Sequence, residues 1–206
     1  MNVLLINGSP RKDGCTNAAL SEAAGALNAN GIETRIYHIG KAPIQDCTAC
    51  RGCAGSGRCV FGGDGVNECA ELLKAADGLI VGSPVYYGAA AGSVCSFLDR
   101  LFFLKSGPYE QKPAAAVVCC RRAGATAALD RLNKYFMLSS MPVVTSQYWN
   151  MVHGNTPDEA RRDLEGMQTM RTLGSNMAWL LKCIGAAKGA VPPPEREARV
   201  ATNFIR

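Results

Sequence analysis

The sequence has little of several features that usually indicate function. Only two of its 206 residues are histidine, and aromatic residues make up 7%. Charged residues are scattered along the chain and sum to a net charge of +5, without the basic stripe that binds nucleic acid. No apolar run approaches the roughly 18 residues that cross a bilayer. We therefore expect neither a nucleic-acid partner nor a membrane protein.

The N-terminal stretch MNVLLINGSP also lacks the basic region of a signal peptide. Its apolar run extends only from Val3 to Ile6, and Gly-Ser-Pro follows at once, so it predicts a buried first strand. We expect a cytoplasmic protein, in which the ten cysteines would be reduced thiols. A tight cysteine cluster then indicates a metal or redox site, not disulfides.

Short apolar runs alternate with helical patterns along the chain. Strands are predicted at residues 3–6, 34–39, 78–84, 114–119 and 141–147, and helical spacing covers residues 20–27, 69–76, 94–101, 129–136 and 157–184. Five strands that alternate with five helices indicate a doubly wound, parallel α/β sheet, because parallel neighbours require crossover connections. The order of the strands does not follow from this alternation.

We expect one domain over residues 1–185, with a cysteine-rich insert at residues 41–68. Residues 186–206 are predicted to form an extended tail. Three consecutive prolines in this tail cannot continue the last helix.

The loop after the first strand, NGSPRKDGCTN, carries candidate anion ligands. Ligands of open α/β sheets bind beyond the carboxyl ends of the strands. Hydroxyl, amide and guanidinium donors stand here just before the N-terminus of a helix, where free backbone N–H groups add to them. These features predict a phosphate site made by Ser9, Arg11, Thr16 and Asn17. The alternative is an ordinary turn in which Thr16 caps the helix.

The loop after the third strand contains two adjacent tyrosines between Pro84 and Gly88. Tyr86 and Tyr87 could line a flat heteroaromatic ring, which the small residues around them would allow to approach closely. The alternative is that both tyrosines only cap the end of the sheet.

The loop after the fourth strand carries Arg121, Arg122 and Gly124 just before another helix. A cation in this position would stabilise the negative charge of a reduced flavin. The alternative is a solvated pair of arginines.

Four segments together resemble the NADPH-dependent FMN reductase family of flavodoxin-like proteins: NGSPRKDGCTN, ADGLIVGSPVYYG, SFLDRLFF and DLEGMQTMRTLGSNMAWLLKC. The resemblance covers nearly the whole chain and implies a sheet of order 2-1-3-4-5, non-covalent FMN and a homodimer or homotetramer. The implied FMN ligands are Ser9, Arg11, Cys15, Thr16 and Asn17 at the phosphate, Pro84, Val85, Tyr86, Tyr87 and Gly88 at the isoalloxazine, and Arg121, Arg122 and Gly124 at its pyrimidine edge. Cys15 stands where the family often has a polar residue.

Cys47, Cys50, Cys53 and Cys59 follow the spacing C-x2-C-x2-C-x5-C. Such spacing can converge on one compact site, as in ferredoxin-type runs. Zinc sites more often use two separated C-x2-C pairs, and the second pair is missing here. The insert also resembles the compact motif of iron-sulfur flavoproteins. Two interpretations stay open: four ligands of a 4Fe-4S cluster, or a thiol-rich loop beside the flavin or at a subunit interface.

The resemblance implies an FMN-dependent oxidoreductase. NAD(P)H would pass a hydride to FMN, and the electrons would continue to a small acceptor such as a quinone, a nitro or azo compound or free flavin. We assign no side chain a catalytic proton transfer, because FMN performs the chemistry. One alternative is an iron-sulfur flavoprotein that relays electrons between ferredoxin, a cluster and FMN. A non-enzymatic flavodoxin-type carrier is the other, and the cysteine insert and the long last helix argue against it.

Overall fold

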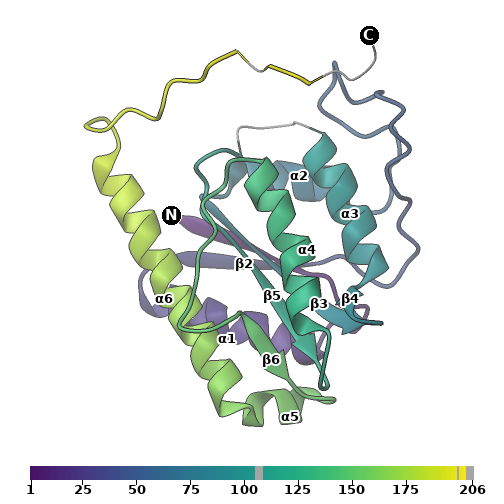
Figure 1. Cartoon of the computed structure of the whole chain (residues 1–206), viewed down its shortest axis with the longest axis vertical. Helices are drawn as coiled ribbons and strands as arrows, with labels where there is room; N and C mark the ends of the chain where they lie inside the picture. Colours follow the sequence, from purple (N-terminus) through teal and green to yellow (C-terminus); the bar gives the residue numbers. More distant parts are fainter. Residues whose placement is uncertain (105–108, 199, 203–206) are drawn as a thin grey trace.

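The structure is a computed structural model that describes residues 1–104, 109–198 and 200–202. A parallel sheet stands at its centre, with helices on both faces (Figure 1). Its strands are β1 (Asn2–Asn7), β2 (Glu33–His38), β3 (Gly78–Tyr86), β5 (Ala114–Cys120) and β6 (Met151–His153). They lie in the order β2-β1-β3-β5-β6. A short sixth strand, β4 (Ala89–Ala90), pairs antiparallel with β3 alone and was not predicted. Without β4, the order is the expected 2-1-3-4-5.

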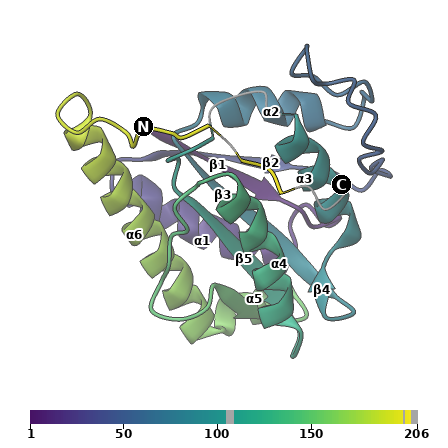
Figure 2. The same cartoon turned by 45° about the horizontal axis from the view of Figure 1, so that its top comes forward.

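The helices divide into two layers. They are α1 (Cys15–Ala29), α2 (Val66–Ala75), α3 (Gly92–Phe103), α4 (Ala125–Leu138), α5 (Pro157–Arg162) and α6 (Leu164–Ala187). Helices α1, α5 and α6 cover one face, and α2, α3 and α4 cover the other (Figure 2). Alternate residues of β1 supply the two cores: Val3 and Leu5 face α1, whereas Leu4 and Ile6 face α3. This is the burial that a doubly wound sheet requires.

The predicted fifth strand at residues 141–147 is wrong in position. Val143 forms only an isolated bridge with Ala114, and the paired strand is β6, further along the chain. Pro142 has no N–H and can only accept a hydrogen bond, here from Ala114 N at 2.9 Å. The chain then leaves the sheet and rejoins it where Asn150 O accepts from Val118 N at 3.0 Å.

The predicted single helix over residues 157–184 is in fact two helices. Asp163 ends α5 and is the N-cap of α6. Its carboxylate accepts from Gly166 N at 2.9 Å and from His153 N at 2.7 Å. An aspartate that satisfies the free N–H groups of a new helix favours a break at that residue.

The predicted insert is irregular over most of its length. The structure describes all of residues 40–65, and none lies in a helix or strand. Figures 1 and 2 both show this segment on the outer side of α3. At the other end of the chain, α6 extends to Ala187, two residues into the predicted tail. Residues 188–198 and 200–202 are irregular, and residues 199 and 203–206 lie outside the described part.

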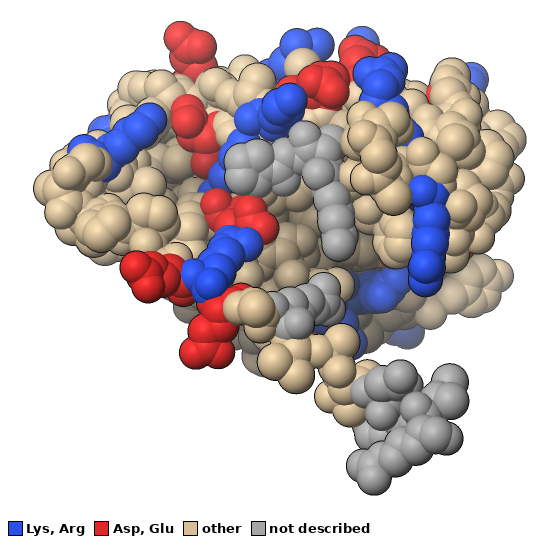
Figure 3. Space-filling model, turned by 90° about the horizontal axis from the view of Figure 1, so that it is seen from above, with Lys and Arg blue, Asp and Glu red and all other residues tan. Residues whose placement is uncertain are grey.

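The surface carries both signs of charge. Figure 3 shows Lys and Arg side chains interleaved with Asp and Glu over one face, in agreement with the scattered charges of the sequence. Among the described residues, no helix combines the length and apolar character needed to span a membrane.

Lys112 caps the C-terminus of α2 from a distant part of the chain. Its half-buried Nζ donates to the carbonyl oxygens of Leu73, Lys74 and Ala76 at 2.9, 2.8 and 2.6 Å. A cation at this end also faces the negative pole of the helix dipole.

We expect Lys112→Met to lower the free energy of unfolding by about 1–3 kcal/mol, because three carbonyls lose a charged donor. Chemical denaturation would measure the loss. Lys74→Met, on the exposed side of the same helix, is the control and should change stability by less than about 0.5 kcal/mol. Equal effects of the two substitutions would contradict the capping role.

Candidate functional site

The carboxyl ends of the parallel strands lie along one edge of the sheet, where their loops touch. Gly8 N donates to Gly82 O at 2.9 Å, which joins the loop after β1 to β3. His38 Nε2 lies 2.7 Å from Ser9 O, which joins the end of β2 to the same loop. A Cβ on Gly8 would stand 2.8 Å from Gly82 O, so only glycine allows this approach.

The loops after β3 and β5 meet at a second close approach. A Cβ on Gly124 would lie 2.6 Å from the Cα of Gly88, and both glycines have positive φ. On the other side, Cys15 Sγ donates to Gly154 O at 3.6 Å and ties the start of α1 to the loop after β6. The fold therefore brings the three predicted FMN-binding loops to one edge.

The loop after β1 is organised from its interior by Asn7. This side chain is fully buried; its Oδ1 accepts from Ser9 N at 3.1 Å and its Nδ2 donates to Lys12 O at 2.9 Å. Ser9 Oγ in turn accepts from Arg11 N at 3.1 Å. Asn7 Nδ2 also lies 3.5 Å from Asn17 Oδ1. The loop is thus held in one shape by its own polar groups.

Helix α1 begins at Cys15, with Gly14 as its N-cap. The alternative in which Thr16 caps the helix is wrong, because Thr16 lies inside the first turn and is buried. Glycine supplies no side-chain acceptor, so the first backbone N–H groups of α1 stay open to an anion. Burial raises the pKa of Cys15, which keeps its thiol a neutral donor to Gly154 O.

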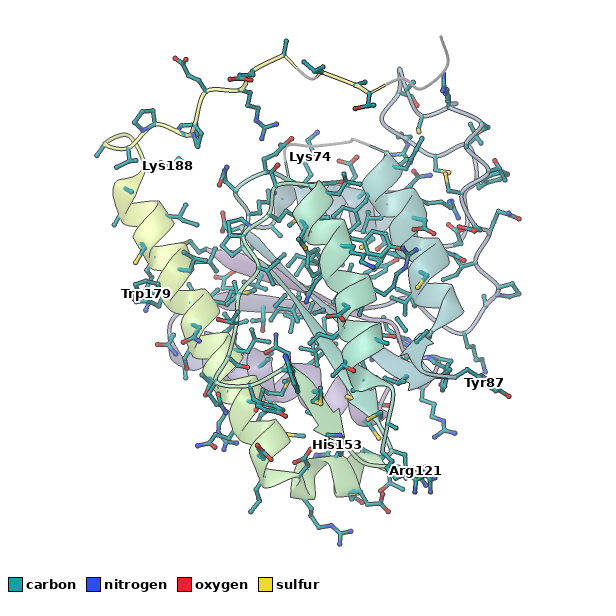
Figure 4. The ribbon with its side chains drawn as sticks, viewed as in Figure 1. Lys74, Tyr87, Arg121, His153, Trp179 and Lys188 are labelled. Atoms are coloured by element: carbon teal, nitrogen blue, oxygen red, sulfur yellow. The ribbon has the colours of Figure 1, made fainter. Side chains whose placement is uncertain are left out.

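Tyr86 lies at the end of a strand, and Tyr87 lies in the tight turn that follows it. Strand β3 runs on through Tyr86, and Tyr87 with Gly88 forms the two-residue turn into β4, both with positive φ as a type I′ turn requires. Tyr86 is 48% exposed and Tyr87 is fully exposed. Figure 4 shows Tyr87 pointing away from the body of the molecule.

Arg121 and Arg122 are exposed at the end of β5, and Gly124 is the N-cap of α4. Figure 4 shows Arg121 at the same end of the molecule as Tyr87. Neither arginine belongs to an ion pair within the described residues. Both guanidinium groups are therefore available at the edge where the flavin is expected.

A second feature is a cavity in the insert, on the outer side of α3. Its walls include Phe61, Arg100 and Phe103. All four cysteines of the C-x2-C-x2-C-x5-C pattern, Cys47, Cys50, Cys53 and Cys59, line it. The fold thus places all four cysteines in the wall of one cavity.

The backbone around Cys50 is shaped to favour an anion. Ala49 and Arg51 on either side have φ of 53° and 58°, a conformation that side chains rarely adopt. Hydrogen bonds from Gly52 N and then from the Thr48 hydroxyl lower the pKa of Cys50. The exposed Cys50 is therefore the thiol of this insert that ionises more readily than usual.

All ten cysteines are free thiols. No group of three or more His, Cys, Asp or Glu in the described part of the chain is arranged to hold a single metal ion.

Residues 1–156 match the family described as NADPH-dependent FMN reductase. This chain belongs to that family. An iron-sulfur flavoprotein of Methanocaldococcus jannaschii is 32% identical over 192 residues, which cover 89% of this chain and 99% of the relative. Among solved structures, RosB with a bound riboflavin-5′-phosphate derivative has a TM-score of 0.71 at 17% identity, covering 100% and 94% of the two chains. A flavodoxin from the domain Archaea has a TM-score of 0.59 at 16% identity, covering 88% and 99%.

The fold is therefore flavodoxin-like, and the chain is an FMN-binding oxidoreductase by family. The loop after β1 fits a phosphate, because uncapped N–H groups, an exposed Arg11 and the Ser9 turn stand at one helix start. A Cβ on Gly14 would lie 3.2 Å from the Arg11 side chain and 3.6 Å from Ser9 Oγ.

Sequence reasoning missed four polar residues that shape the two sites: Asn7, His38, Ser83 and Arg100. Ser83 is buried and its Oγ accepts from Ala91 N at 3.0 Å, which fixes the start of α3 beside the β3 end. Asn7 and Ser83 both follow apolar strand residues, and that position is a signal for a site residue. Arg100 lies three residues after buried Phe97, on the apolar face of α3. A cation on a core-facing stripe was the signal in that case.

We expect Ser9→Ala to weaken FMN binding about tenfold, because the phosphate loop loses the acceptor that holds Arg11 N. Riboflavin has no phosphate, so its affinity should barely change. Quenching of flavin fluorescence would measure both affinities. Ser21→Ala, on the exposed face of α1, is the matched control. Equal losses for the two flavins would contradict the phosphate assignment.

Proposed function

We propose that this protein is an oxidoreductase of the iron-sulfur flavoprotein type, with FMN at the carboxyl edge of the sheet and a 4Fe-4S cluster in the cysteine insert. The observation that carries the proposal is the single cavity lined by all four cysteines. The iron-sulfur flavoprotein of Methanocaldococcus jannaschii, similar over nearly its whole length, supports it. When bound, FMN would supply hydride and single-electron chemistry, and the cluster would supply single-electron transfer.

At the FMN site, the chain's role is to bind and orient. The open N–H groups of α1 and the side chains of Ser9 and Arg11 would hold the phosphate. Residues 84–88 would lie along the ring, and Arg121 or Arg122 would face its pyrimidine edge. A guanidinium there favours the anionic reduced flavin over the neutral oxidised one.

In the insert, the four cysteines would be the ligands as thiolates. The cysteines could surround a bound group, because all four line one cavity. The hydrogen bonds from Gly52 N and the Thr48 hydroxyl, which lower the pKa of Cys50, would stabilise the negative charge of this ligand.

The two sites are connected through the end of β2. The insert follows shortly after this strand. The last residue of β2, His38, contacts Ser9 O of the phosphate loop at 2.7 Å. Ligands in the insert therefore start from the same edge as the FMN site. We infer that electrons pass between the insert and this edge, within one chain or across a homodimer.

We expect about four iron and four sulfide ions per chain after anaerobic reconstitution, and their loss in Cys47→Ser, Cys53→Ser and Cys59→Ser. Cys183→Ser, which removes an exposed thiol on α6, is the control and should keep all the iron. Circular dichroism should show the sheet intact in every variant, because the insert lies outside it. Iron-free wild-type protein from anaerobic preparation would overturn the cluster and leave a thiol-rich loop.

A second candidate function is direct oxidation of NAD(P)H, which the description of the matched family favours. The exposed edge at Tyr86, Tyr87 and Arg122 leaves room for a nicotinamide to reach a bound flavin. The same face would then admit a quinone, a nitro or azo compound or free flavin in turn. A ferredoxin would be the donor if nicotinamide is not used.

We expect the FMN-loaded protein to oxidise NADPH or NADH when a quinone is present, with ping-pong kinetics because donor and acceptor share one face. Absorbance at the nicotinamide band would measure the rate. Cys50→Ser should leave this rate nearly unchanged, since the cluster is not needed for direct transfer. A protein that oxidises neither NADPH nor NADH but accepts electrons from reduced ferredoxin would contradict this second function. A protein that reacts with neither the nucleotides nor ferredoxin would favour the flavodoxin-type carrier.

A further inference from the structure

Arg100 is unusual for its burial. It is 1% exposed and is the only charged residue in the buried class among the residues that the structure describes. A buried guanidinium loses its hydration, and this cost is offset only when its donors are satisfied. The partners of Arg100 therefore indicate what the arginine is retained for.

Within the described part of the chain, the hydrogen-bond and ion-pair partners of the Arg100 side chain all lie in the cysteine insert. Its Nη1 donates to Gln45 O at 3.2 Å and pairs with Asp64, and its Nη2 donates to Phe61 O at 2.8 Å. The guanidinium carbon also lies 5.6 Å from the centre of the Phe61 ring. The remaining donor, Nε, points to a sulfur: it lies 3.2 Å from Cys59 Sγ.

Cys59 is held from a second side by α2. Asn67 Oδ1 accepts from Cys59 N at 2.8 Å, and Asn67 Nδ2 donates to Cys59 O at 3.0 Å. Asn67 thus fixes the backbone of this cysteine, whereas Arg100 contacts its sulfur. By contrast, Cys50 is exposed at the mouth of the insert. Cys59 is the proposed ligand whose position is set in advance by two helices.

We propose that Arg100 is a positioning residue that sets Cys59 in place before the cluster binds and, by donating to its sulfur, raises the reduction potential of the cluster. The proposal rests on the cluster assignment above. Reduction adds negative charge to the cluster and its thiolates, so a nearby cation and a hydrogen bond to sulfur stabilise the reduced state more than the oxidised one. Removing them should move the potential to more negative values.

A purely structural role would not require the contact with sulfur. Asp64 and the carbonyl oxygens of Gln45 and Phe61 already satisfy both terminal nitrogens of the guanidinium. The guanidinium of an arginine stays protonated in proteins, so a positive charge lies beside the sulfur. A permanent cation beside a ligand sulfur makes the bound group easier to reduce, in addition to any effect on the fold.

The test compares Arg100→Met with Asn67→Ala. Both remove support for Cys59, but only the first removes the donor to its sulfur. In metal-free protein, trypsin should cut after the exposed Arg51 and Arg58 about tenfold faster in both variants than in wild type, because the insert opens more often. In reconstituted protein, redox titration should give a more negative cluster potential for Arg100→Met and a wild-type value for Asn67→Ala.

Two controls separate the possible failures. Arg131→Met removes an exposed arginine of α4 and should change neither readout, and the FMN potential should stay constant in all variants. A wild-type protein that binds no cluster overturns the proposed function and the tuning of its potential, while the trypsin rates still decide the positioning. A wild-type protein that binds the cluster, with an unshifted potential in Arg100→Met, overturns the tuning alone.

Arg100→Lys covers the case in which Arg100→Met does not fold. Lysine keeps the charge, but one ammonium cannot serve the sulfur, both carbonyl oxygens and Asp64 together. We expect a cleavage rate and a potential that both depart from wild type. Wild-type values of both quantities in Arg100→Lys would overturn the proposal.

Discussion

The parallel pairing of the central strands is the constraint on which the rest of this structure depends. Because β2, β1, β3, β5 and β6 all point the same way, every strand must return through a helix, and all five carboxyl ends lie on one edge. The helices that this return requires bury both faces. The polar loops are left to meet at the edge, where Gly8 contacts Gly82 and Gly124 contacts Gly88. Core and site are thus consequences of one geometry.

The two candidate sites are held by different means. The phosphate loop is short and is fixed by the buried amide of Asn7 at the end of a strand. The cysteine insert has no strand partner over residues 40–65, so side chains must replace the missing ladder. Arg100 and Asn67 do so from two helices. Burying the charge of Arg100 and ordering the long insert are both unfavourable. The contacts between Arg100 and the insert offset both free-energy costs.

Much of the fold could be predicted from local patterns, and the departures have identifiable causes. The apolar run from Val3 to Ile6 placed the first strand correctly, but residues 141–147, which also begin with apolar residues, form only an isolated bridge to the sheet at Val143. There, Pro142 offers no donor. Likewise, the apolar stripe continues across Asp163, although its carboxylate starts a new helix. Periodicity reports which face is buried, whereas hydrogen-bond partners decide where an element ends.

The sequence by itself determined the α/β alternation, the family, the donors of the first loop and the spacing of the four cysteines. These are properties of neighbouring residues, and neighbours in sequence are the contacts that a pattern records. Only the tertiary structure decided that Tyr87 points outward on a hairpin, that the four cysteines line one cavity, and that Arg100 reaches Cys59. The cavity wall and the Arg100 contact join the insert to α3, about 40 residues further along the chain, and their distances depend on helix packing, which no local pattern contains.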